Sequence, residues 1–321
     1  MPLPDQAEAT PWTVGVRSRL PSQPWRTRFA PAPTGHLHLG HLANALHVWG
    51  LARAFGGQVV LRLEDHDRSR CRPEYEAALL EELDTFGFVP DAYGTDSFRA
   101  DRTAHPARQS NQDGRYAAAL ASLAAGGMVY PCRCSRRMIA EPQALPDGAE
   151  PRYPGTCRSA QLAPDATPAR RVLLAPGPWA FEDLRLGRIV QEPAAQCGDL
   201  LVRDRLGQWT YQFAVVVDDA EQGIDVVIRG EDLLQSTGRQ LQLAALLGRR
   251  TPPVYCHHPL LTHADGRKLS KAAQDTSLRA LREAGWSVPA LIGHAAWRAG
   301  LMPTGAPVPF QAIVDRLEGT G

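Results

Sequence analysis

Two short segments, far apart in the sequence, carry side chains that can bind phosphate groups. The first, Arg28-Phe-Ala-Pro-Ala-Pro-Thr-Gly-His-Leu-His-Leu-Gly-His41, places His38 and His41 three residues apart at the predicted start of a helix. The N–H groups and dipole of a helix start favour phosphate, and residues three apart share one face. Gly40 removes a side chain where a nucleotide could approach. We expect these residues to bind phosphates, although either histidine alone could be a surface or capping residue.

The second segment, Gly266-Arg-Lys-Leu-Ser-Lys271, contains Lys268 and Lys271, which are the only lysines among the 35 Lys and Arg residues of the chain. Lysine is a compact, mobile point charge, whereas arginine is a broad planar fork. In a sequence so strongly biased toward arginine, the two lysines indicate chemistry for which a guanidinium would not serve. The alternative is a flexible polar loop that contains both by chance.

Three cysteines, Cys132, Cys134 and Cys157, fall within 26 residues of irregular sequence. Clustered cysteines in a chain without a secretory signal favour a metal over a disulfide, and three thiolates favour one structural Zn²⁺ per chain. Tyr153, four residues before Cys157, is the candidate fourth ligand, with water as the alternative. Free thiols beside a loop are the competing interpretation, and the other three cysteines are interpreted as small apolar residues.

The elements that must position these residues follow an alternating order. A strand over Arg26 to Ala30, a helix from His38 to Phe55, a strand over Gln58 to Glu64 and a helix from Pro73 to Gly87 predict a parallel sheet. After a helix over Gly114 to Ala125, periodicity fades. The alternation resumes with Tyr211 to Asp218, Asp225 to Arg229, a helix over Gly238 to Leu247 and a strand near Val254 to Leu261.

The sequence therefore predicts an α/β fold with a doubly wound parallel sheet. Its parts are a mobile extension over 1–24, a first half of the sheet domain over 25–130, an insertion over 131–205, a second half over 206–275 with the lysine loop, and a helical region over 276–321.

The His38-Leu-Gly-His41 and Lys268-Leu-Ser-Lys271 segments together resemble the HIGH and KMSKS signatures of class I aminoacyl-tRNA synthetases. Further segments are similar to the glutamate-specific branch of that class, and they are Leu61-Arg-Leu-Glu-Asp-His-Asp67, Tyr211-Gln-Phe-Ala-Val-Val-Val-Asp-Asp219 and Val227-Ile-Arg-Gly-Glu-Asp232. The resemblance implies a Rossmann-type catalytic domain that activates glutamate with ATP and Mg²⁺. It implies that the catalytic residues are His38, His41, Lys268 and Lys271, with Gly40 also in the ATP site.

The resemblance also implies a glutamate-binding set, which consists of Arg28, Ala30, Ala32, Glu64, Tyr211 and Arg229. Glutamate carries two carboxylates and one ammonium group, so two arginines, one carboxylate and a phenol are nearly complementary to it. Glu64 is assigned to the ammonium and Arg229 to a carboxylate, while the carboxylate for Arg28 stays open. The competing interpretations are a solvated strand-end charge for Glu64, an ion pair with Glu231 or Asp232 for Arg229, and a core or strand position for Tyr211.

The acceptor of glutamate is inferred from two further features. The Cys-x-Cys and Tyr-x-x-x-Cys spacings resemble a short glutamate-type branch, and only 50 residues follow Lys271, which leaves no room for a separate anticodon-reading domain. The resemblance implies that glutamate is esterified to queuosine in the anticodon of tRNA(Asp). Near the expected zinc site, five arginines could contact RNA phosphates, with a solvated face as the competing interpretation, and they are Arg133, Arg136, Arg137, Arg152 and Arg158.

Composition sets broad limits on this interpretation. The net charge of +1 neither supports nor excludes an RNA partner. Residues 1–24 lack a continuous apolar run, so a signal peptide or membrane anchor is not expected, and we expect a cytoplasmic protein, with a monomer favoured. The rival functions are a shortened synthetase that charges a tRNA 3′ end, a small-molecule nucleotidylyltransferase, and a catalytically silent RNA-binding paralogue.

Overall fold

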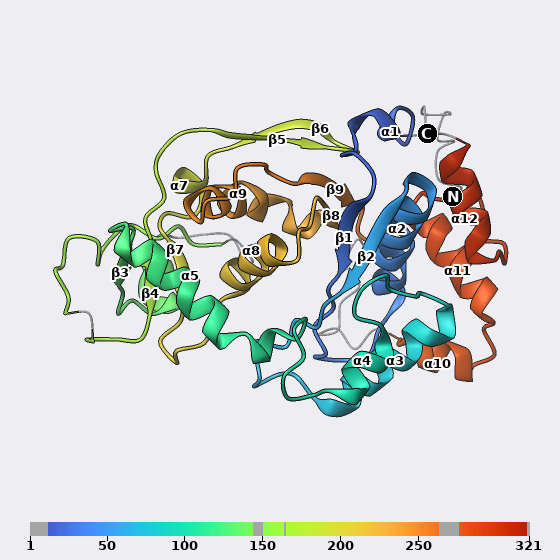
Figure 1. Cartoon of the computed structure of the whole chain (residues 1–321), viewed down its shortest axis with the longest axis horizontal. Helices are drawn as coiled ribbons and strands as arrows, with labels where there is room; N and C mark the ends of the chain where they lie inside the picture. The colour runs from blue at the N-terminus through green and yellow to red at the C-terminus, as the bar shows by residue number, and fades with distance from the viewer. Residues whose placement is uncertain (1–11, 144–149, 164, 263–275, 320–321) are drawn as a thin grey trace.

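Four parallel strands form the centre of the protein in the computed structural model, which describes residues 12–143, 150–163, 165–262 and 276–319. Strand β1 (Trp25–Phe29) pairs in parallel with β2 (Gly57–Leu61), and β8 (Val226–Gly230) pairs in parallel with β9 (Val254–His258). Strand β8 lies beside β1, where the Asp225 N–H donates to the Arg26 carbonyl over 2.8 Å (Figure 1). The carboxyl ends of these strands therefore meet at one edge of the sheet, as the alternating sequence predicts.

Two more strands extend this sheet beyond β9. Strand β5 (Trp179–Asp183) aligns in parallel with β9 at the pair Asp183 and Tyr255, and β6 (Gly187–Gln191) pairs with β5 in antiparallel fashion. The sheet is thus mixed at this edge. The middle of the region expected to be a single irregular insertion therefore belongs to the main sheet, and buried Phe181 of β5 shares an apolar cluster with Val227 of β8 and Tyr255 of β9.

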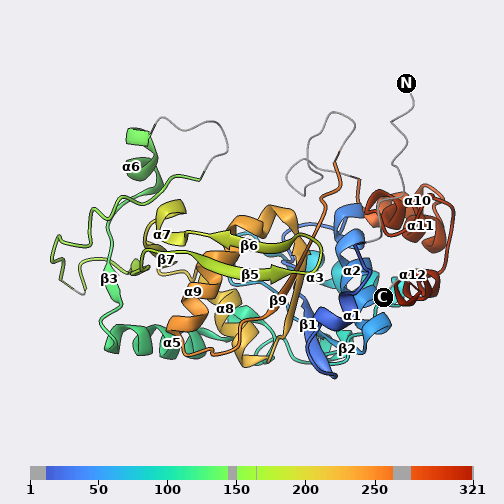
Figure 2. The same cartoon turned by 90° about the horizontal axis from the view of Figure 1, so that it is seen from above.

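A separate three-stranded antiparallel sheet lies at one end of the molecule. It consists of β3 (Val129–Pro131), β4 (Arg170–Val172) and β7 (Leu200–Arg203), in the order β3-β4-β7. Figure 2 shows this end, with helix α6 (Arg136–Ala140), on the opposite side of the main sheet from the C-terminal helices. A small cluster of buried residues at this end of the molecule contains Cys132, Ile139, Tyr153 and Cys157.

Helix α2 (Leu39–Phe55) has buried residues around nearly its whole circumference, because other elements cover two opposite faces of it. It packs on the central strands and against α11 (Val288–Arg298) and α12 (Phe310–Glu318) (Figure 1). The helix ends at Gly56, whose φ of 74° is left-handed and favours glycine. Gly50 allows the close approach of α12, since a Cβ there would lie 2.9 Å from the Leu317 side chain.

Two expectations differ from the structure. The segment Tyr211–Glu221 is helix α8 and not a strand of the alternating order, because its buried residues pack on neighbouring helices such as α9 (Thr237–Leu246). In addition, residues 12–24 are not a mobile extension. They contain helix α1 (Val16–Arg19), and Val16 is fully buried in the main core.

The remaining elements connect these layers. They are α3 (Pro73–Phe86), α4 (Thr95–Ala100), α5 (Asp113–Ala125), α7 (Pro193–Gln196) and α10 (Leu278–Glu283), with 3₁₀ turns over Gln109–Asn111, Glu141–Gln143 and Glu231–Ser236. Among the described residues, no helix combines the length and apolar character needed to cross a membrane.

Candidate active site

A pocket of about 460 Å³ opens at the carboxyl ends of β1, β2, β8 and β9. This edge of a parallel sheet is where ligands bind in open α/β folds. Lys268 and Lys271, predicted to complete the ATP site, lie outside the described residues. All the other predicted ATP and glutamate residues line this pocket, and they are Arg28, Ala30, Ala32, His38, Gly40, His41, Glu64, Tyr211 and Arg229.

His38 and His41 begin helix α2 with a reciprocal cap. The His38 Nδ1 accepts a hydrogen bond from the Gly40 N–H over 3.1 Å, and the His41 Nδ1 accepts one from the His38 N–H over 3.2 Å. Each neutral ring therefore carries its proton on Nε2, because Nδ1 is the acceptor. The rings lie 4.0 Å apart between centroids. The two histidines thus cap the helix, and both line the pocket.

Gly40 has a role in this cap that the sequence did not reveal. A Cβ at position 40 would lie 2.9 Å from Cε1 of the His38 ring and 3.1 Å from its Nδ1. Glycine therefore makes room for the capping ring of His38, and it also lines the pocket. The expectation of an open approach for a nucleotide at Gly40 stays a prediction.

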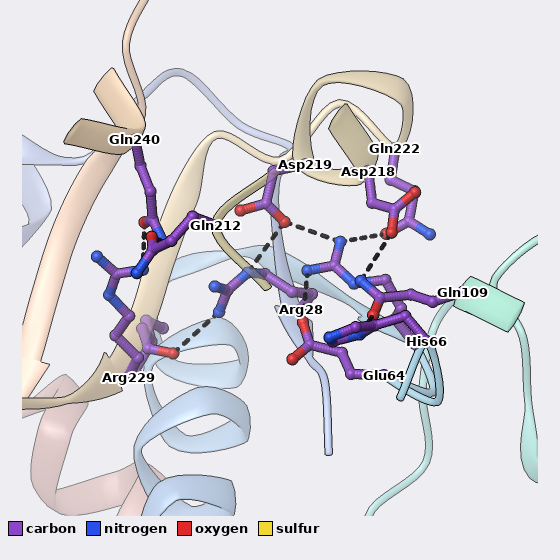
Figure 3. Close-up of polar contacts among 12 residues, drawn as sticks. Arg28, Glu64, His66, Gln109, Gln212, Asp218, Asp219, Gln222, Arg229 and Gln240 are labelled. Atoms are coloured by element: carbon purple, nitrogen blue, oxygen red, sulfur yellow. Dashed lines mark hydrogen bonds and ion pairs between the residues drawn. The ribbon is translucent and has the colours of Figure 1, made fainter. Parts of the chain in front are cut away.

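A buried ionic network joins Arg28 and Glu64, two residues that line the pocket (Figure 3). Oδ1 of Asp219 lies 3.2 Å from Nε of Arg28 and 2.8 Å from Nη1 of Arg62. Nη2 of Arg62 lies 3.3 Å from Oε1 of Glu64. This chain of contacts connects β1, the end of β2 and helix α8, so Arg28 and Glu64 are held by the same buried pair.

The pKa values of the two carboxyl groups shift in opposite directions. Burial alone would raise the pKa of Asp219, but Arg28 and Arg62 lower it below its ordinary value. Burial raises the pKa of Glu64, and the charges of Arg62, Arg28 and His66 only partly oppose this. Asp219 is therefore the firmly ionised partner of the arginines, while Glu64 gains from a cation placed beside it.

Arg229, which is 4% exposed, has only neutral partners among the described residues. Its guanidinium donates to Nε2 of His257 over 3.0 Å, to Oε1 of Gln240 over 2.6 Å and to Oγ1 of Thr237 over 2.8 Å. The alternative of an ion pair between Arg229 and Glu231 is wrong, because Glu231 pairs with Arg185. The ion pairs of the described residues include none between Arg229 and Asp232. A buried cation without a counter-charge favours an anionic ligand.

Tyr211 and the two alanines complete the lining. Tyr211 is half-buried at the first position of α8, and burial raises the pKa of its phenol, so the hydroxyl remains a neutral donor. Ala30 and Ala32 lie in the turn between β1 and α2. The Glu64 N–H donates to the Pro31 carbonyl over 3.1 Å, which joins this turn to the end of β2.

Several residues of the site had no predicted role. Arg62 stands between Leu61 and Leu63, and a charge inside an apolar strand was the signal for a buried ion pair. Asp219 follows Asp218 directly after the apolar run of α8, and both of these residues are buried. The contacts of Gln240 and His257 with Arg229 join positions far apart in sequence, so spacing alone carried no signal for them.

Comparison with known proteins identifies the family. A family model described as tRNA synthetases class I (E and Q), catalytic domain, matches residues 24–307. The chain belongs to this synthetase family. Proteins named Glutamyl-Q tRNA(Asp) synthetase from Cupriavidus metallidurans and Methylococcus capsulatus are 44% and 41% identical to it, over 82% and 87% of this chain and 84% and 86% of theirs.

A solved structure agrees with this membership in the class I synthetase family. The glutamate-tRNA synthetase from Elizabethkingia anophelis superimposes with a TM-score of 0.73 at 25% identity, and the match covers 91% of this chain and 65% of that chain. The chain thus spans just under two thirds of that solved synthetase.

A second site of this synthetase-family chain contains the clustered cysteines. The sulfur atoms of Cys132, Cys134 and Cys157 all lie within 4.8 Å of one another, and those of Cys134 and Cys157 are 3.6 Å apart. The Tyr153 hydroxyl lies 3.6 Å from the Cys132 sulfur and accepts the Cys157 N–H over 2.8 Å. The four predicted ligands are brought together, and the three thiols can bind a metal ion.

The five arginines predicted to contact RNA surround this cysteine group and are all exposed. Three of them have partners within the protein. Arg137 pairs with Glu141, Arg158 pairs with Asp199, and the remaining contact is from Arg152 to a backbone carbonyl. Their contact with RNA stays a prediction.

Replacing Asp219 by asparagine tests the importance of the buried network. Asp219→Asn leaves two buried arginines without their shared counter-charge, and we expect it to lower the free energy of unfolding by about 3 kcal/mol. The Asp219 pKa is lower in the folded protein than in the unfolded chain, so its contribution is complete above about pH 4 and lost as the pH falls through the folded pKa. The difference between the two proteins in urea unfolding should therefore shrink in acid.

The matched control is Asp96→Asn. Asp96 pairs with Arg99 on α4, but its side chain is 97% exposed, so we expect a change within about 0.5 kcal/mol. Equal, small losses for both variants would contradict the role given to Asp219.

Proposed function

We propose that this protein activates glutamate with ATP and transfers it to queuosine in the anticodon of tRNA(Asp). The name of its relatives, Glutamyl-Q tRNA(Asp) synthetase, supports this proposal. The observation that carries the first step is the buried Arg229, with its neutral partners, in one pocket with Glu64 and the paired histidines. Such a pocket is suited to an amino acid with two carboxylates beside a phosphate-binding helix start.

In this proposal the charges of glutamate match the charges of the pocket. The Glu64 carboxylate receives the ammonium group, which also favours the ionised form of a residue whose pKa is raised by burial. Arg229 receives one carboxylate. Arg28 faces the same pocket, and the carboxylate that it contacts stays open. Tyr211 donates its phenol hydrogen to a substrate oxygen.

Activation is a displacement at the α-phosphorus of ATP. An α-carboxylate oxygen of glutamate forms a bond to phosphorus while the bond to the pyrophosphate oxygen breaks, which gives glutamyl-adenylate and pyrophosphate. The carboxylate is ionised at pH 7, so the protein mainly orients the reactants and stabilises charge. His38 and His41 bind the phosphates through Nε2–H, Gly40 lies beside them, and Lys268 and Lys271 approach the leaving group. Mg²⁺ enters with ATP.

The second step transfers glutamate to an alcohol. A hydroxyl of the queuosine cyclopentenediol attacks the carbonyl carbon of the adenylate, AMP leaves with the bonding electrons, and the hydroxyl proton is released to solvent. This cis-diol is chemically close to the 2′,3′-diol at a tRNA 3′ end, so one active site can serve either acceptor. The choice of queuosine is supported by the relatives, which match this chain over most of their own length.

Labelled glutamate distinguishes the two acceptors. With ATP, the purified protein should label tRNA(Asp) that contains queuosine and leave tRNA(Asp) with unmodified guanosine at that position essentially unlabelled, because only the first offers the cyclopentenediol. Equal labelling of both tRNAs would contradict the proposal and favour a shortened synthetase that charges the 3′ end.

We also propose that the cysteine group binds one structural Zn²⁺, with Tyr153 or water as the fourth ligand. Two sulfurs bound to one zinc ion at about 2.3 Å with tetrahedral angles lie roughly 3.8 Å apart, close to the 3.6 Å between Cys134 and Cys157. The apolar core around these residues is small, so a bound metal would hold together a region that hydrophobic packing alone supports weakly.

Metal analysis checks the zinc site. The purified chain should contain about one zinc per molecule, and Cys157→Ser should lose most of this metal and unfold at a lower temperature. Cys71→Ser is the control, because Cys71 lies far along the chain in the loop before α3, and it should retain the metal. A metal-free protein with unchanged thermal stability would contradict the site.

A further inference from the structure

Arg229 is connected across three neighbouring strands to a buried carboxylate. Arg229 on β8 lies opposite His257 on β9, and β9 is paired with β5, which ends at Asp183. Nδ1 of His257 lies 2.6 Å from Oδ2 of Asp183, and Nε2 of His257 lies 3.0 Å from Nε of Arg229. The His257 and Asp183 side chains are fully buried.

The hydrogen bonds determine which nitrogen of His257 carries the proton. A guanidinium only donates, so Nε2 must accept from Arg229 and cannot carry a hydrogen. The proton is therefore on Nδ1, where the carboxylate of Asp183 accepts it. His257 is a neutral ring with one fixed tautomer, and it presents a lone pair to Arg229.

Asp183 is suited to fixing this tautomer because it can only accept. Its Oδ1 accepts the N–H groups of Arg185 over 3.0 Å and Leu186 over 2.9 Å. Its Oδ2 accepts the backbone N–H of His257 over 3.0 Å as well as the ring N–H. Four donors point at one carboxyl group, so the ionised form is the one that satisfies them all.

The interposed ring keeps a protein carboxylate from binding Arg229 directly. Arg28 shows the other arrangement, because its guanidinium makes a direct ion pair with Asp219. A carboxylate in direct contact with Arg229 would neutralise it and compete with the substrate. A neutral imidazole holds the guanidinium by Nε and leaves its charge available, which suits a residue that must receive an anion.

We propose that Asp183 and His257 are positioning residues that orient Arg229 toward a carboxylate of glutamate. This inference rests on the proposed activation of glutamate. In this role Asp183 and His257 make no contact with the reacting atoms. The pair acts on the affinity for glutamate through Arg229, and the ATP part of the pocket, around His38 and His41, does not depend on it.

Two substitutions at His257 separate the contacts of its two ring nitrogens, which are Nδ1 with Asp183 and Nε2 with Arg229 and Thr237. In His257→Asn the side-chain amide can reach Asp183, as Nδ1 does, but is too short to reach Arg229. In His257→Gln the amide oxygen can extend to the position of Nε2 and accept from Arg229. The assay is pyrophosphate exchange into ATP, measured over a range of glutamate and ATP concentrations, with a thermal melt for each variant.

For His257→Asn we expect the KM for glutamate to rise about 10- to 100-fold, the range for loss of a hydrogen bond to a charged group, with the KM for ATP and kcat within about twofold. His257→Gln should restore the KM for glutamate to within about fivefold of the original protein. The control His294→Asn, on α11, should change neither constant.

The results separate this inference from the function on which it rests. No glutamate-dependent exchange by the unaltered protein would contradict the proposed activation itself. Normal exchange by the unaltered protein, with His257→Asn and His257→Gln giving the same KM for glutamate, would overturn only the positioning role. A fall in kcat together with equal rises in the KM values for glutamate and ATP would likewise overturn it, because such a result indicates a general structural role.

Discussion

The sharing of Asp219 between Arg28 and Arg62 is the interaction on which the geometry of the pocket depends. Arg62 is fully buried, and its ion pairs reach Asp219 on α8 and Glu64 beyond the end of β2. Burying a charge is costly unless the charge is paired and hydrogen-bonded, so each member of this network restricts the positions of the others. Two proposed substrate ligands, Arg28 and Glu64, are thereby fixed before any substrate binds.

The two arginines of the pocket, Arg28 and Arg229, have partners of different charge. Arg28 is paired directly with a carboxylate, so part of its charge is compensated within the protein. Arg229 is held by an imidazole, an amide and a hydroxyl, so its charge is not compensated by a direct contact. Electrostatic preorganisation of this kind orients donors toward an anion without a conformational change at the moment of binding. A pocket with this division of charge is suited to an acidic amino acid.

Much of the site could be predicted from the sequence because its parts are local. His38 and His41 act through one helix turn, and the cysteine spacing is short. Arg28 lies within a predicted strand, whereas Glu64 and Arg229 end predicted strands. Parallel strands bring their carboxyl ends to one edge, so these local patterns meet in space.

The rest could not be predicted, because tertiary contacts decided it. The β-branched run before Asp218 is compatible with a strand, yet packing against α9 makes this segment a helix. The pairing of β5 with β9 draws residues from the irregular region into the main sheet. The same pairing brings Asp183 to His257, and no spacing in the sequence indicates a contact between positions so far apart.

The central claim is that glutamate activated in this pocket is transferred to the anticodon and not to the end of the tRNA. It is tested most directly by nuclease digestion of queuosine-containing tRNA(Asp) after reaction with labelled glutamate and ATP. The account predicts that the label stays with the anticodon fragment. Label on the 3′ terminal adenosine would contradict it.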